Sequence, residues 1–220
     1  MKSSSRIQLE KWLSSMKVRC NSVLDIGGSF KPVKERCCSF NVDDYIILEK
    51  RMSNDCKIKP DIIFDMNNKI HDNSFIYNKY LNRFNKVFML EVSESMFNPM
   101  RAFKNVNRFL KMGGTFYVST HFVYPVYGLT EEDYIRYTPR GIEKMLEIAG
   151  FEIVDHTLKL EERPLFLGGN GFADTIVHWF KKQNMDMSED YDYHNATGSL
   201  VKCKKIKEYV KDNYKFNKEI

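Results

Sequence analysis

Hydrophobic residues follow two alternating patterns along this chain. Short runs rich in β-branched and aromatic residues, typical of buried strands, are separated by segments in which apolar residues recur at helical spacing. Because strands that alternate with helices form a sheet covered on both faces, this pattern predicts an α/β fold with a doubly wound, mostly parallel sheet of seven strands. The strands are expected at 22–26, 45–48, 61–64, 86–92, 115–120, 151–160 and 199–203.

Capping signals mark where the helices begin and end. Asn-Pro at 98–99 and Thr-Pro at 138–139 are typical of helix starts, and the glycine pair at 113–114 is expected to stop the first of these helices. The leading helix has apolar residues that can share one stripe, so we expect it to cover the sheet or the cofactor. The expected helices cover 6–16, 99–110 and 140–149, with a shorter one ending at Phe180.

A chain of 220 residues can bury one full core, so we expect a single domain over 1–220. It divides into an N-terminal helix in 1–20, a cofactor-binding core in 22–160, and a C-terminal helix, strand and basic tail in 161–220. The hydrophobic fraction of 43% and the charged fraction of 29% are ordinary for a globular protein. No apolar stretch is long enough to cross a bilayer and the N-terminus lacks a secretory pattern, so a cytoplasmic protein is expected.

Charge and cysteine content change this picture little. The net charge of +5 comes largely from lysines near the C-terminus, which we interpret as a solvated surface. The five cysteines have spacings that match neither a disulfide framework nor a metal site, so reduced thiols are expected. The sequence leaves the oligomeric state open.

Three expected strands end in residues suited to a nucleoside. In open α/β sheets a ligand lies beyond the carboxyl ends of the strands. The first strand ends at Gly27-Gly28, where the absence of side chains lets the backbone approach a ligand closely. Glu49 ends the second strand, 24 residues after Asp25, and can accept hydrogen bonds from ribose hydroxyls. Asp65 ends the third strand and can accept a hydrogen bond from an adenine amino group.

The segment after the first strand argues against a dinucleotide. Dinucleotide enzymes use a G-x-G-x-x-G turn that opens a helix and holds pyrophosphate at the helix N-terminus. Residues 27–32 read Gly-Gly-Ser-Phe-Lys-Pro and lack that pattern, and Pro32 leaves little room for a helix. The sequence therefore favours a cofactor without phosphates.

These motifs resemble those of the class I S-adenosylmethionine-dependent methyltransferases, especially the methyltransferase-domain group related to sugar and small-molecule O-methyltransferases. The resemblance covers 22–160. Its most specific part is Glu-Val-Ser-Glu-Ser-Met-Phe-Asn-Pro at 91–99 followed by Asn-Arg-Phe-Leu-Lys-Met-Gly-Gly at 107–114. These segments are similar to the family's acidic strand end, proline-started helix and glycine hairpin. The other matching segments are 23–28, 61–66, 72–75, 133–139 and 149–151.

The resemblance implies a Rossmann-like methyltransferase sheet, S-adenosylmethionine as the cofactor, and methyl transfer as the reaction. Two positions depart from the family pattern. Ser29 stands where a second glycine is usual, and Ser95 stands where many relatives have a histidine that could act as acid or base. Together, the strand ends and the resemblance give the residues expected to bind the cofactor, namely Asp25, Gly27, Gly28, Glu49, Asp65, Met66 and Glu91.

The acceptor is expected near the segment that leaves the fifth strand. His121 follows that strand and can act as a base toward a hydroxyl near neutral pH, although a histidine bonded to the loop backbone is an equal alternative. Asp133 is a second acid-base candidate, and its alternative is an ion pair with Arg136 that holds the loop. The residues expected to bind the acceptor are Tyr124, Tyr127, Tyr134, Arg136 and Tyr137.

Methylation of a hydroxyl on a sugar, a glycan or another small molecule is the expected reaction. No further cluster of oxygen ligands is found at the strand ends, so no metal is expected. Nucleic-acid methylation is disfavoured because the polar-Pro-Pro-aromatic signature and a Pro-Cys dipeptide are both absent. The alternatives are a lipid or amine acceptor, and a non-catalytic subunit that binds the cofactor or a partner.

Overall fold

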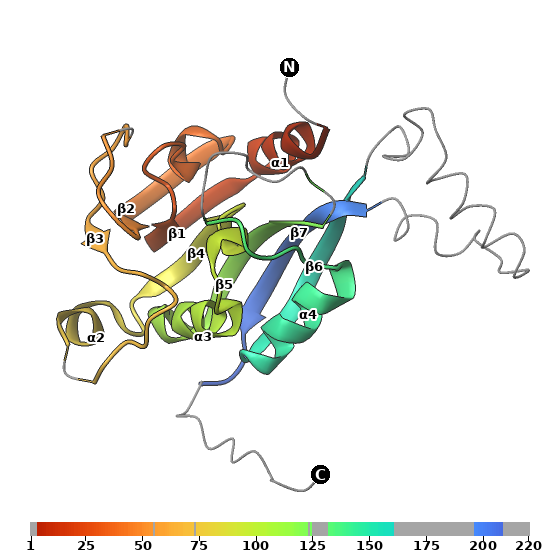
Figure 1. Cartoon of the computed structure of the whole chain (residues 1–220). Helices are drawn as coiled ribbons and strands as arrows, with labels where there is room; N and C mark the ends of the chain where they lie inside the picture. Colours follow the sequence, from red (N-terminus) through yellow and green to blue (C-terminus); the bar gives the residue numbers. More distant parts are fainter. Residues whose placement is uncertain are drawn as a thin grey trace, which may run out of the picture.

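The computed structural model describes residues 4–54, 56–72, 74–122, 124, 132–160 and 196–208. Seven strands form one sheet in the order β3-β2-β1-β4-β5-β7-β6 (Figure 1). All seven expected strands are present, and five of them, β1, β2, β4, β5 and β7, begin earlier in the chain than expected. The strands are β1 (Lys17–Ile26), β2 (Ser39–Glu49), β3 (Ile62–Ile63), β4 (Phe84–Leu90), β5 (Leu110–His121), β6 (Phe151–Leu160) and β7 (Ala196–Lys205).

Strand direction changes at one end of the sheet. Neighbouring strands from β3 through β2, β1 and β4 to β5 run parallel. β7 runs antiparallel to both of its neighbours, β5 and β6. The prediction of a seven-stranded, Rossmann-like sheet is confirmed, but the sheet is mixed and ends in an antiparallel group. A strand covered on both faces has the same apolar pattern in either direction, so the sequence pattern could not reveal this reversal.

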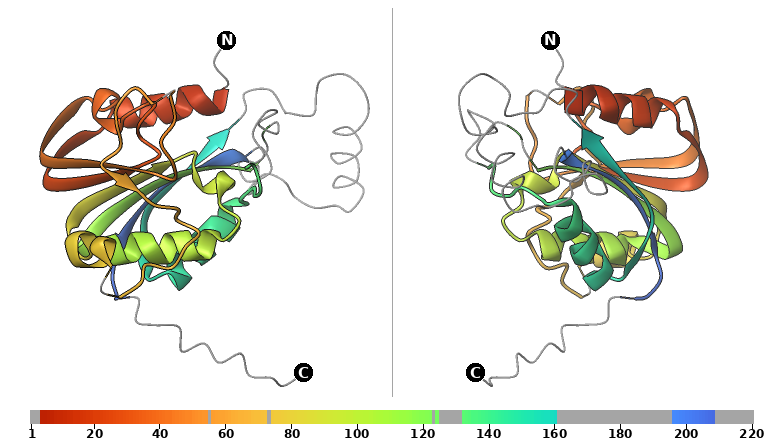
Figure 2. Two further views of the ribbon diagram at one scale, coloured as in Figure 1. Left: turned by 60° about the vertical axis from the view of Figure 1, so that its left-hand side comes forward. Right: turned by 90° about the vertical axis from the view of Figure 1, so that its right-hand side faces the viewer.

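Helices cover both faces of the sheet (Figure 2). On one face Leu9 and Leu13 of α1 pack in a cluster with Phe88 of β4. On the other face Phe103 of α3 belongs to the larger core. The chain passes from β1 to β2 through only a short 3-10 helix, Val33–Glu35, so the face covered by α1 depends on the N-terminal helix. The helices are α1 (Ser4–Ser14), α2 (Phe75–Tyr80), α3 (Pro99–Phe109) and α4 (Pro139–Ile148).

The predicted starts of α3 and α4 are confirmed. The side chain of Asn98 accepts a hydrogen bond from the N–H of Arg101 at 3.1 Å. The hydroxyl of Thr138 accepts one from the N–H of Gly141, also at 3.1 Å. In both helices a proline follows the cap. A backbone N–H at this position would make no intrahelical hydrogen bond, so proline, which lacks the N–H, sacrifices none. These helix starts are decided by neighbours in sequence, which is why they could be predicted.

The prediction that the glycine pair at 113–114 stops α3 is wrong. α3 ends at Phe109 and β5 begins at the next residue, so both glycines lie inside the strand. Gly113 has a φ of 75°, and the register of β5 against β4 shifts between Phe84 and Lys86. The pair therefore marks a bulge in β5. The helix expected to end at Phe180 lies outside the described residues.

The core on the α3 face gives a stability test. Phe103 is fully buried, and its ring centroid lies 6.2 Å from that of Phe116 and 6.3 Å from that of Tyr137. Phe103→Ala should lower the free energy of unfolding by about 3–5 kcal/mol, because it removes apolar contacts and leaves a cavity. The control is Phe75→Ala, since Phe75 is 67% exposed and its loss should cost less than about 1 kcal/mol. Urea denaturation measures both variants, and equal losses would contradict this description of the core.

Candidate functional site

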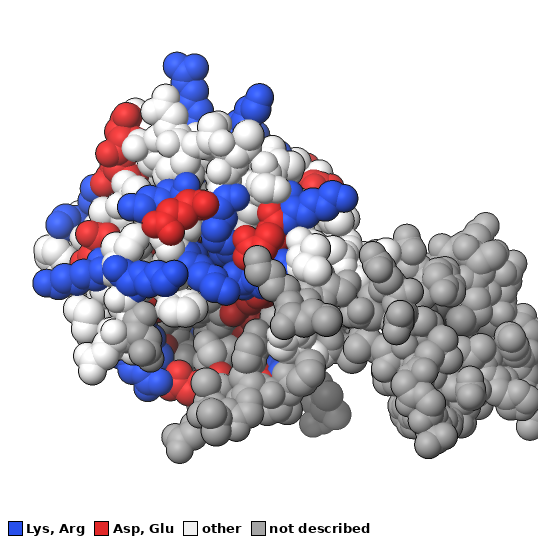
Figure 3. All heavy atoms as spheres, turned by 90° about the horizontal axis from the view of Figure 1, so that it is seen from above, with Lys and Arg blue, Asp and Glu red and all other residues white. Residues whose placement is uncertain are grey.

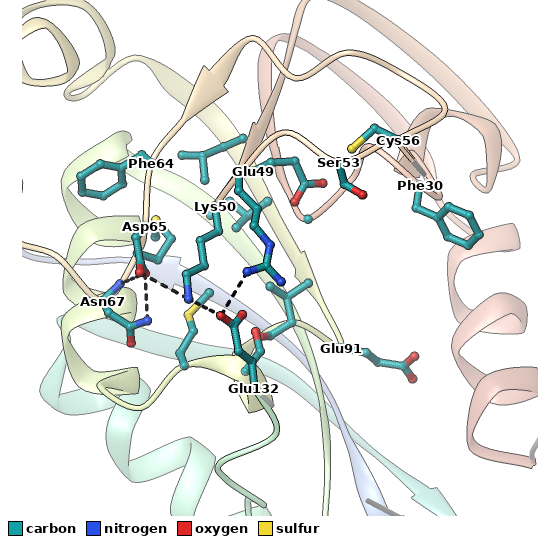
Figure 4. Close-up of a pocket in the computed structure, with 18 residues that line it drawn as sticks. Phe30, Glu49, Lys50, Ser53, Cys56, Phe64, Asp65, Asn67, Glu91 and Glu132 are labelled. Carbon is teal, nitrogen blue, oxygen red and sulfur yellow. Dashed lines mark hydrogen bonds and ion pairs between the residues drawn. The ribbon is translucent and has the colours of Figure 1, made fainter. Parts of the chain in front are cut away.

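The carboxyl ends of β1, β2, β3 and β4 meet at one edge of the sheet, where a pocket of about 410 Å³ opens. Five of the residues expected to bind the cofactor line this pocket, namely Gly27, Glu49, Asp65, Met66 and Glu91. Parallel strands bring them together because their carboxyl ends lie side by side. Figure 4 shows the carboxylates around one opening, with Glu91 on the side of α1.

Gly27 forms the turn after β1. Its φ of 80° lies in the left-handed region that favours glycine, and a side chain here would collide with Val92. The N–H of Gly27 donates to the carbonyl of Leu48 at 2.9 Å, which ties the turn to the end of β2. Gly28 lies outside this pocket, and a Cβ there would collide with the carboxylate of Asp25. Gly27 thus forms the pocket wall, while Gly28 lets Asp25 pack against the turn.

Asp25 holds the turn in place. Its Oδ2 accepts hydrogen bonds from the N–H of Val33 at 2.8 Å and from the hydroxyl of Tyr45 at 2.5 Å. Burial raises the pKa of Asp25 to about 6, against the effect of these two hydrogen bonds. Asp25 lines a second hollow of about 240 Å³, which shares Gly27 and Glu91 with the main pocket. Any contact of Asp25 with a cofactor would have to be made from this second hollow.

Glu49 and Asp65 have partners within the protein. Oε1 of Glu49 accepts a hydrogen bond from the N–H of Ser29 at 2.9 Å, so the residue in place of the second glycine contributes its backbone. Oδ1 of Asp65 accepts hydrogen bonds from the backbone N–H and the side-chain amide of Asn67, at 2.9 and 2.8 Å. Met66 is almost fully buried and forms an apolar part of the pocket wall. Carboxylates beside an apolar wall suit the ribose and base of a nucleoside.

Lys50 and Glu132 line the same pocket, although the sequence did not single them out. Nζ of Lys50 lies 2.7 Å from Oε1 of Glu132 and 3.6 Å from Oδ2 of Asp65, and Arg51 lies 3.6 Å from the same Glu132 oxygen (Figure 4). The hydrogen bond to Glu132 raises the pKa of Lys50. Lys50 had one local signal, its place directly after Glu49. Glu132 had none, because it reaches the pocket from 82 positions further along the chain.

Glu91 is the centre of a buried ionic network at this edge. Its Oε2 accepts a hydrogen bond from Arg6 of α1 at 2.8 Å, and its Oε1 accepts one from Lys159 of β6 at 2.9 Å. Nε2 of His121 lies 3.3 Å from the same Oε1. Burial opposes the charge, but His121 and Lys159 hold the pKa of Glu91 well below its usual range. Glu91 is therefore an anion, and it lines both hollows.

His121 is buried in this network. Its Nδ1 lies 3.2 Å from Oε1 of Glu94, which also accepts a hydrogen bond from the backbone N–H of His121 at 2.6 Å. The ring centroid of Tyr124 lies 4.1 Å from that of His121. Burial disfavours the charged imidazole, but the neighbouring carboxylates of Glu91 and Glu94 outweigh burial and raise the pKa of His121. The imidazole thus lies beside two carboxylates that stabilise its protonated form. It can act as a base only after it has lost that proton.

The second acid-base candidate, Asp133, is held by an ion pair. Nη1 of Arg136 donates to Oδ1 of Asp133, and Nη2 donates to Oδ2 at 2.6 Å. This ion pair between Asp133 and Arg136 is the one that the sequence offered as the alternative to an acid-base role for Asp133. The backbone of the next residue is also tied down, since the N–H of Tyr134 donates to the carbonyl of Glu94 at 2.9 Å. Asp133 and Arg136 therefore belong to an ordered segment that packs on the turn after β4.

The tyrosines expected beside the acceptor lie in different places. Tyr134 is half exposed, and its ring meets that of Phe97 edge to face. Tyr137 is 3% exposed and its hydroxyl donates to the carbonyl of Ser93 at 2.9 Å, so it lies in the core and not at the pocket. Tyr127 lies outside the described residues. Of these side chains, Tyr134 has the exposure that contact with an acceptor requires.

The described part of the chain offers neither a cluster of metal ligands nor a membrane-spanning helix. No group of three or more His, Cys, Asp or Glu side chains there is arranged to hold a metal ion. No helix of that part is long and apolar enough to cross a membrane.

The fold is shared with known enzymes. No protein-family model and no curated protein matches the chain in sequence. The structure is similar to that of a SAM-dependent methyltransferase from Archaeoglobus fulgidus, with 13% identity, 92% of both chains covered and a TM-score of 0.54. A second such enzyme, from Mesorhizobium loti, has 15% identity and a TM-score of 0.54, with 91% of this chain and 97% of that chain covered. The chain has the fold of S-adenosylmethionine-dependent methyltransferases.

Other chemistry occurs on this methyltransferase fold as well. The cyclase SpnF is similar to this chain with 15% identity and a TM-score of 0.52, over 90% of this chain and 80% of its own. Within the fold, the strand order changes direction between β1 and β4, and Gly27 and Glu91 directly follow those two strands. The pocket therefore lies at the topological switch point, where open α/β sheets bind their ligands.

The network around Glu91 predicts a pH-dependent stability. Glu91→Gln keeps the shape of the side chain but leaves the buried Lys159 without a carboxylate and Arg6 with Glu10 alone, so it should lower the free energy of unfolding by about 3–5 kcal/mol at pH 7. Folding lowers the pKa of Glu91 from 4.5, so this stabilisation is complete above pH 4.5 and is lost as the pH falls further. Denaturant unfolding at pH 7 and pH 3 should show a difference that narrows at the lower pH. Glu147→Gln, in an exposed pair with Lys144, is the control, and a difference that stays constant with pH would contradict the assignment.

Proposed function

We propose that the protein is an S-adenosylmethionine-dependent methyltransferase that methylates a hydroxyl group of a sugar, a glycan or another small molecule. The observation that carries this proposal is the pocket at the switch point of a methyltransferase fold, where the Gly27 turn faces two strand-end carboxylates, Glu49 and Asp65. The SAM-dependent methyltransferases of Archaeoglobus fulgidus and Mesorhizobium loti support it through their common fold.

The residues present fit S-adenosylmethionine. A volume of about 410 Å³ is within the range of small-molecule sites. Glu49 would accept hydrogen bonds from the ribose hydroxyls, and Asp65 would accept one from the adenine amino group. Gly27 lines the pocket without a side chain, so a ligand can approach the backbone there. Glu91, held as an anion, would stabilise a positive sulfur nearby.

Bound S-adenosylmethionine supplies a methyl group attached to a positively charged sulfur. The protein has to hold the acceptor oxygen in line with the carbon–sulfur bond, exclude water and take up the hydroxyl proton. We assign the proton to His121, a buried side chain that lies beside Glu91, and Glu91 in turn lines both hollows. Asp133 is the weaker candidate because its carboxylate is bound to Arg136.

A lipid or an amine is the alternative acceptor, and a subunit that binds the cofactor or a partner without catalysis is the alternative function. The cyclase SpnF has a similar fold, so the fold alone does not decide the chemistry. Transfer of labelled methyl from S-adenosylmethionine to any acceptor in an extract would exclude the non-catalytic alternative. A methylated amine as the isolated product would overturn the hydroxyl assignment and leave the methyltransferase proposal standing.

The cofactor assignment is tested at Glu49. Glu49→Ala should weaken binding of S-adenosylmethionine and S-adenosylhomocysteine about tenfold to a hundredfold, since a charged hydrogen-bond acceptor contributes roughly 1.5–3 kcal/mol. Glu49→Gln keeps an oxygen for the N–H of Ser29 and therefore separates the charge from the structure of the turn. Glu35→Ala removes an exposed carboxylate and serves as the control. Calorimetry measures all three, and unchanged affinity in a folded Glu49→Ala would remove Glu49 from the site.

The base assignment predicts the pH dependence of turnover. A base must be neutral, and its surroundings raise the pKa of His121 above 6.5, so turnover should rise with pH through that raised value and fall at lower pH. His121→Asn should lower turnover about 10²–10⁴-fold and remove this limb of the pH–rate profile, while the affinity for S-adenosylhomocysteine stays nearly the same. His156→Asn is the matched control, because His156 binds Glu143 and Ser199. Turnover that survives within a few-fold in His121→Asn would mean that the base lies elsewhere or that positioning suffices.

A further inference from the structure

The two ring nitrogens of His121 lie beside different carboxylates. Nδ1 lies 3.2 Å from Oε1 of Glu94, and Nε2 lies 3.3 Å from Oε1 of Glu91. Tyr124 stacks on the ring and Gly198 of β7 lies opposite His121 in the sheet, and neither brings a carboxylate. A neutral imidazole keeps one proton, and the other nitrogen is the basic one. Which nitrogen is basic matters for catalysis only if His121 is the base, so the inference rests on the proposed function.

Glu94 is fixed through both its backbone and its side chain. It lies in the short 3-10 helix after β4, Ser93–Ser95. Its carbonyl accepts hydrogen bonds from the N–H groups of Tyr134 and Ile135, at 2.9 and 3.2 Å. Its Oε1 accepts one from the backbone N–H of His121 at 2.6 Å. The carboxylate of Glu94 is therefore held beside the imidazole by the backbone of His121 itself.

The charge of Glu94 has few other partners. Within the described ranges of the chain, no lysine or arginine forms an ion pair with Glu94, and its Oε2 is buried without a hydrogen-bond partner. Charged side chains of both signs lie on the surface seen in Figure 3, where solvent screens them, but Glu94 is 2% exposed. A buried carboxylate in this position strongly favours a proton on the ring nitrogen that faces it.

Glu91 depends less on His121, because it already has two cations. Lys159 donates a hydrogen bond to its Oε1 at 2.9 Å, and Arg6 donates one to its Oε2 at 2.8 Å. Loss of the proton from Nε2 leaves Glu91 with both of these partners. Loss of the proton from Nδ1 would leave Glu94 with a backbone N–H alone. The proton on Nε2 is therefore the one that is easier to remove.

We propose that Glu94 is a positioning residue that keeps the proton of neutral His121 on Nδ1 and leaves Nε2 as the basic nitrogen. Nε2 is on the side of Glu91, which lines both hollows, whereas Glu94 lines neither of them. The proton of the acceptor hydroxyl then bonds to Nε2, and the electron pair of the broken O–H bond stays on the acceptor oxygen. The imidazolium that forms lies between two carboxylates that stabilise it. Glu94 thus acts through His121 and not on the acceptor.

Nitrogen NMR of the full chain, labelled at its histidine rings, tests the tautomer directly, because protonated and unprotonated ring nitrogens have different chemical shifts. His121→Asn identifies the His121 signals by their loss. When the pH rises through the raised pKa of His121, the unaltered protein should keep the proton on Nδ1 and lose the one on Nε2. A neutral ring with its proton on Nε2 would overturn the proposal. A ring that stays doubly protonated at every pH at which the protein is folded would also overturn it.

Glu94→Gln removes the charge and keeps the shape of the side chain. Glu91 is then the remaining carboxylate beside the ring, so the proton of neutral His121 should move to Nε2 and the pKa of His121 should fall. The rising limb of the pH–rate profile should shift to lower pH, and turnover above it should fall about ten- to a hundredfold. An unchanged tautomer in folded Glu94→Gln would contradict the proposal. The matched control is Glu143→Gln, which removes the carboxylate 2.5 Å from Nδ1 of His156 and should leave the His121 signals and the profile unchanged.

The outcomes separate the role of Glu94 from the base assignment. If neutral His121 keeps its proton on Nδ1 but His121→Asn retains turnover within a few-fold, the proposed base is wrong and the tautomer assignment holds. If the proton is on Nε2 and His121→Asn still loses turnover, the base assignment holds and the role of Glu94 is overturned. The first measurement uses the unaltered protein, so it decides the proposal even if Glu94→Gln does not fold.

Discussion

Glu91 and the cations around it join four parts of the fold. Arg6 comes from α1, Lys159 from β6 and His121 from β5, while Glu91 itself follows β4. Burying a charge costs several kcal/mol unless the charge has a partner in good geometry. If one of these side chains moved away, another buried charge would therefore lose its partner. Since Glu91 lines both hollows, the contacts that hold α1 over the sheet also shape the candidate site.

The turn after β1, which lines both hollows together with Glu91, keeps its shape without a following helix. Pro32 and the short 3-10 helix replace a full crossover helix between β1 and β2. The buried carboxylate of Asp25 compensates by accepting hydrogen bonds from the N–H of Val33 and the hydroxyl of Tyr45, which connects the turn to β2. A turn held by a side chain in this way leaves the backbone at Gly27 open toward the pocket.

The two hollows differ in how their charges are arranged. In the main pocket the cation of Lys50 is matched by Asp65 and Glu132, and an apolar wall at Met66 completes a surface that suits a neutral base. Arg6 and Arg36, which line the second hollow, share Glu10, so positive charge dominates on the α1 side. A ligand with an uncharged ring at one end and charged groups at the other would match this division, and adenosylmethionine has such a shape and charge pattern.

The sequence by itself determined the presence of the seven strands and the starts of two helices, but not the starts of most strands, the end of α3 or the presence of α2. Hydrophobic spacing predicted the seven strands, Asn98 and Thr138 predicted two helix starts, and the strand-end residues Glu49 and Asp65 do line one pocket. Hydrophobic periodicity and helix capping depend on residues that are close together in the chain, so these features can be predicted from the sequence.

Only the tertiary structure decided strand direction and side-chain partners. The reversal of β7, the bulge at 113–114 and the two carboxylates beside His121 all depend on segments that meet across the sheet. Arg6 and Lys159 reach Glu91 from 85 and 68 positions away, so no local pattern could predict that they neutralise it. Whether a carboxylate or a histidine is charged, engaged or open to a ligand depends on such distant neighbours, because Coulomb interaction and desolvation act through space and not along the chain.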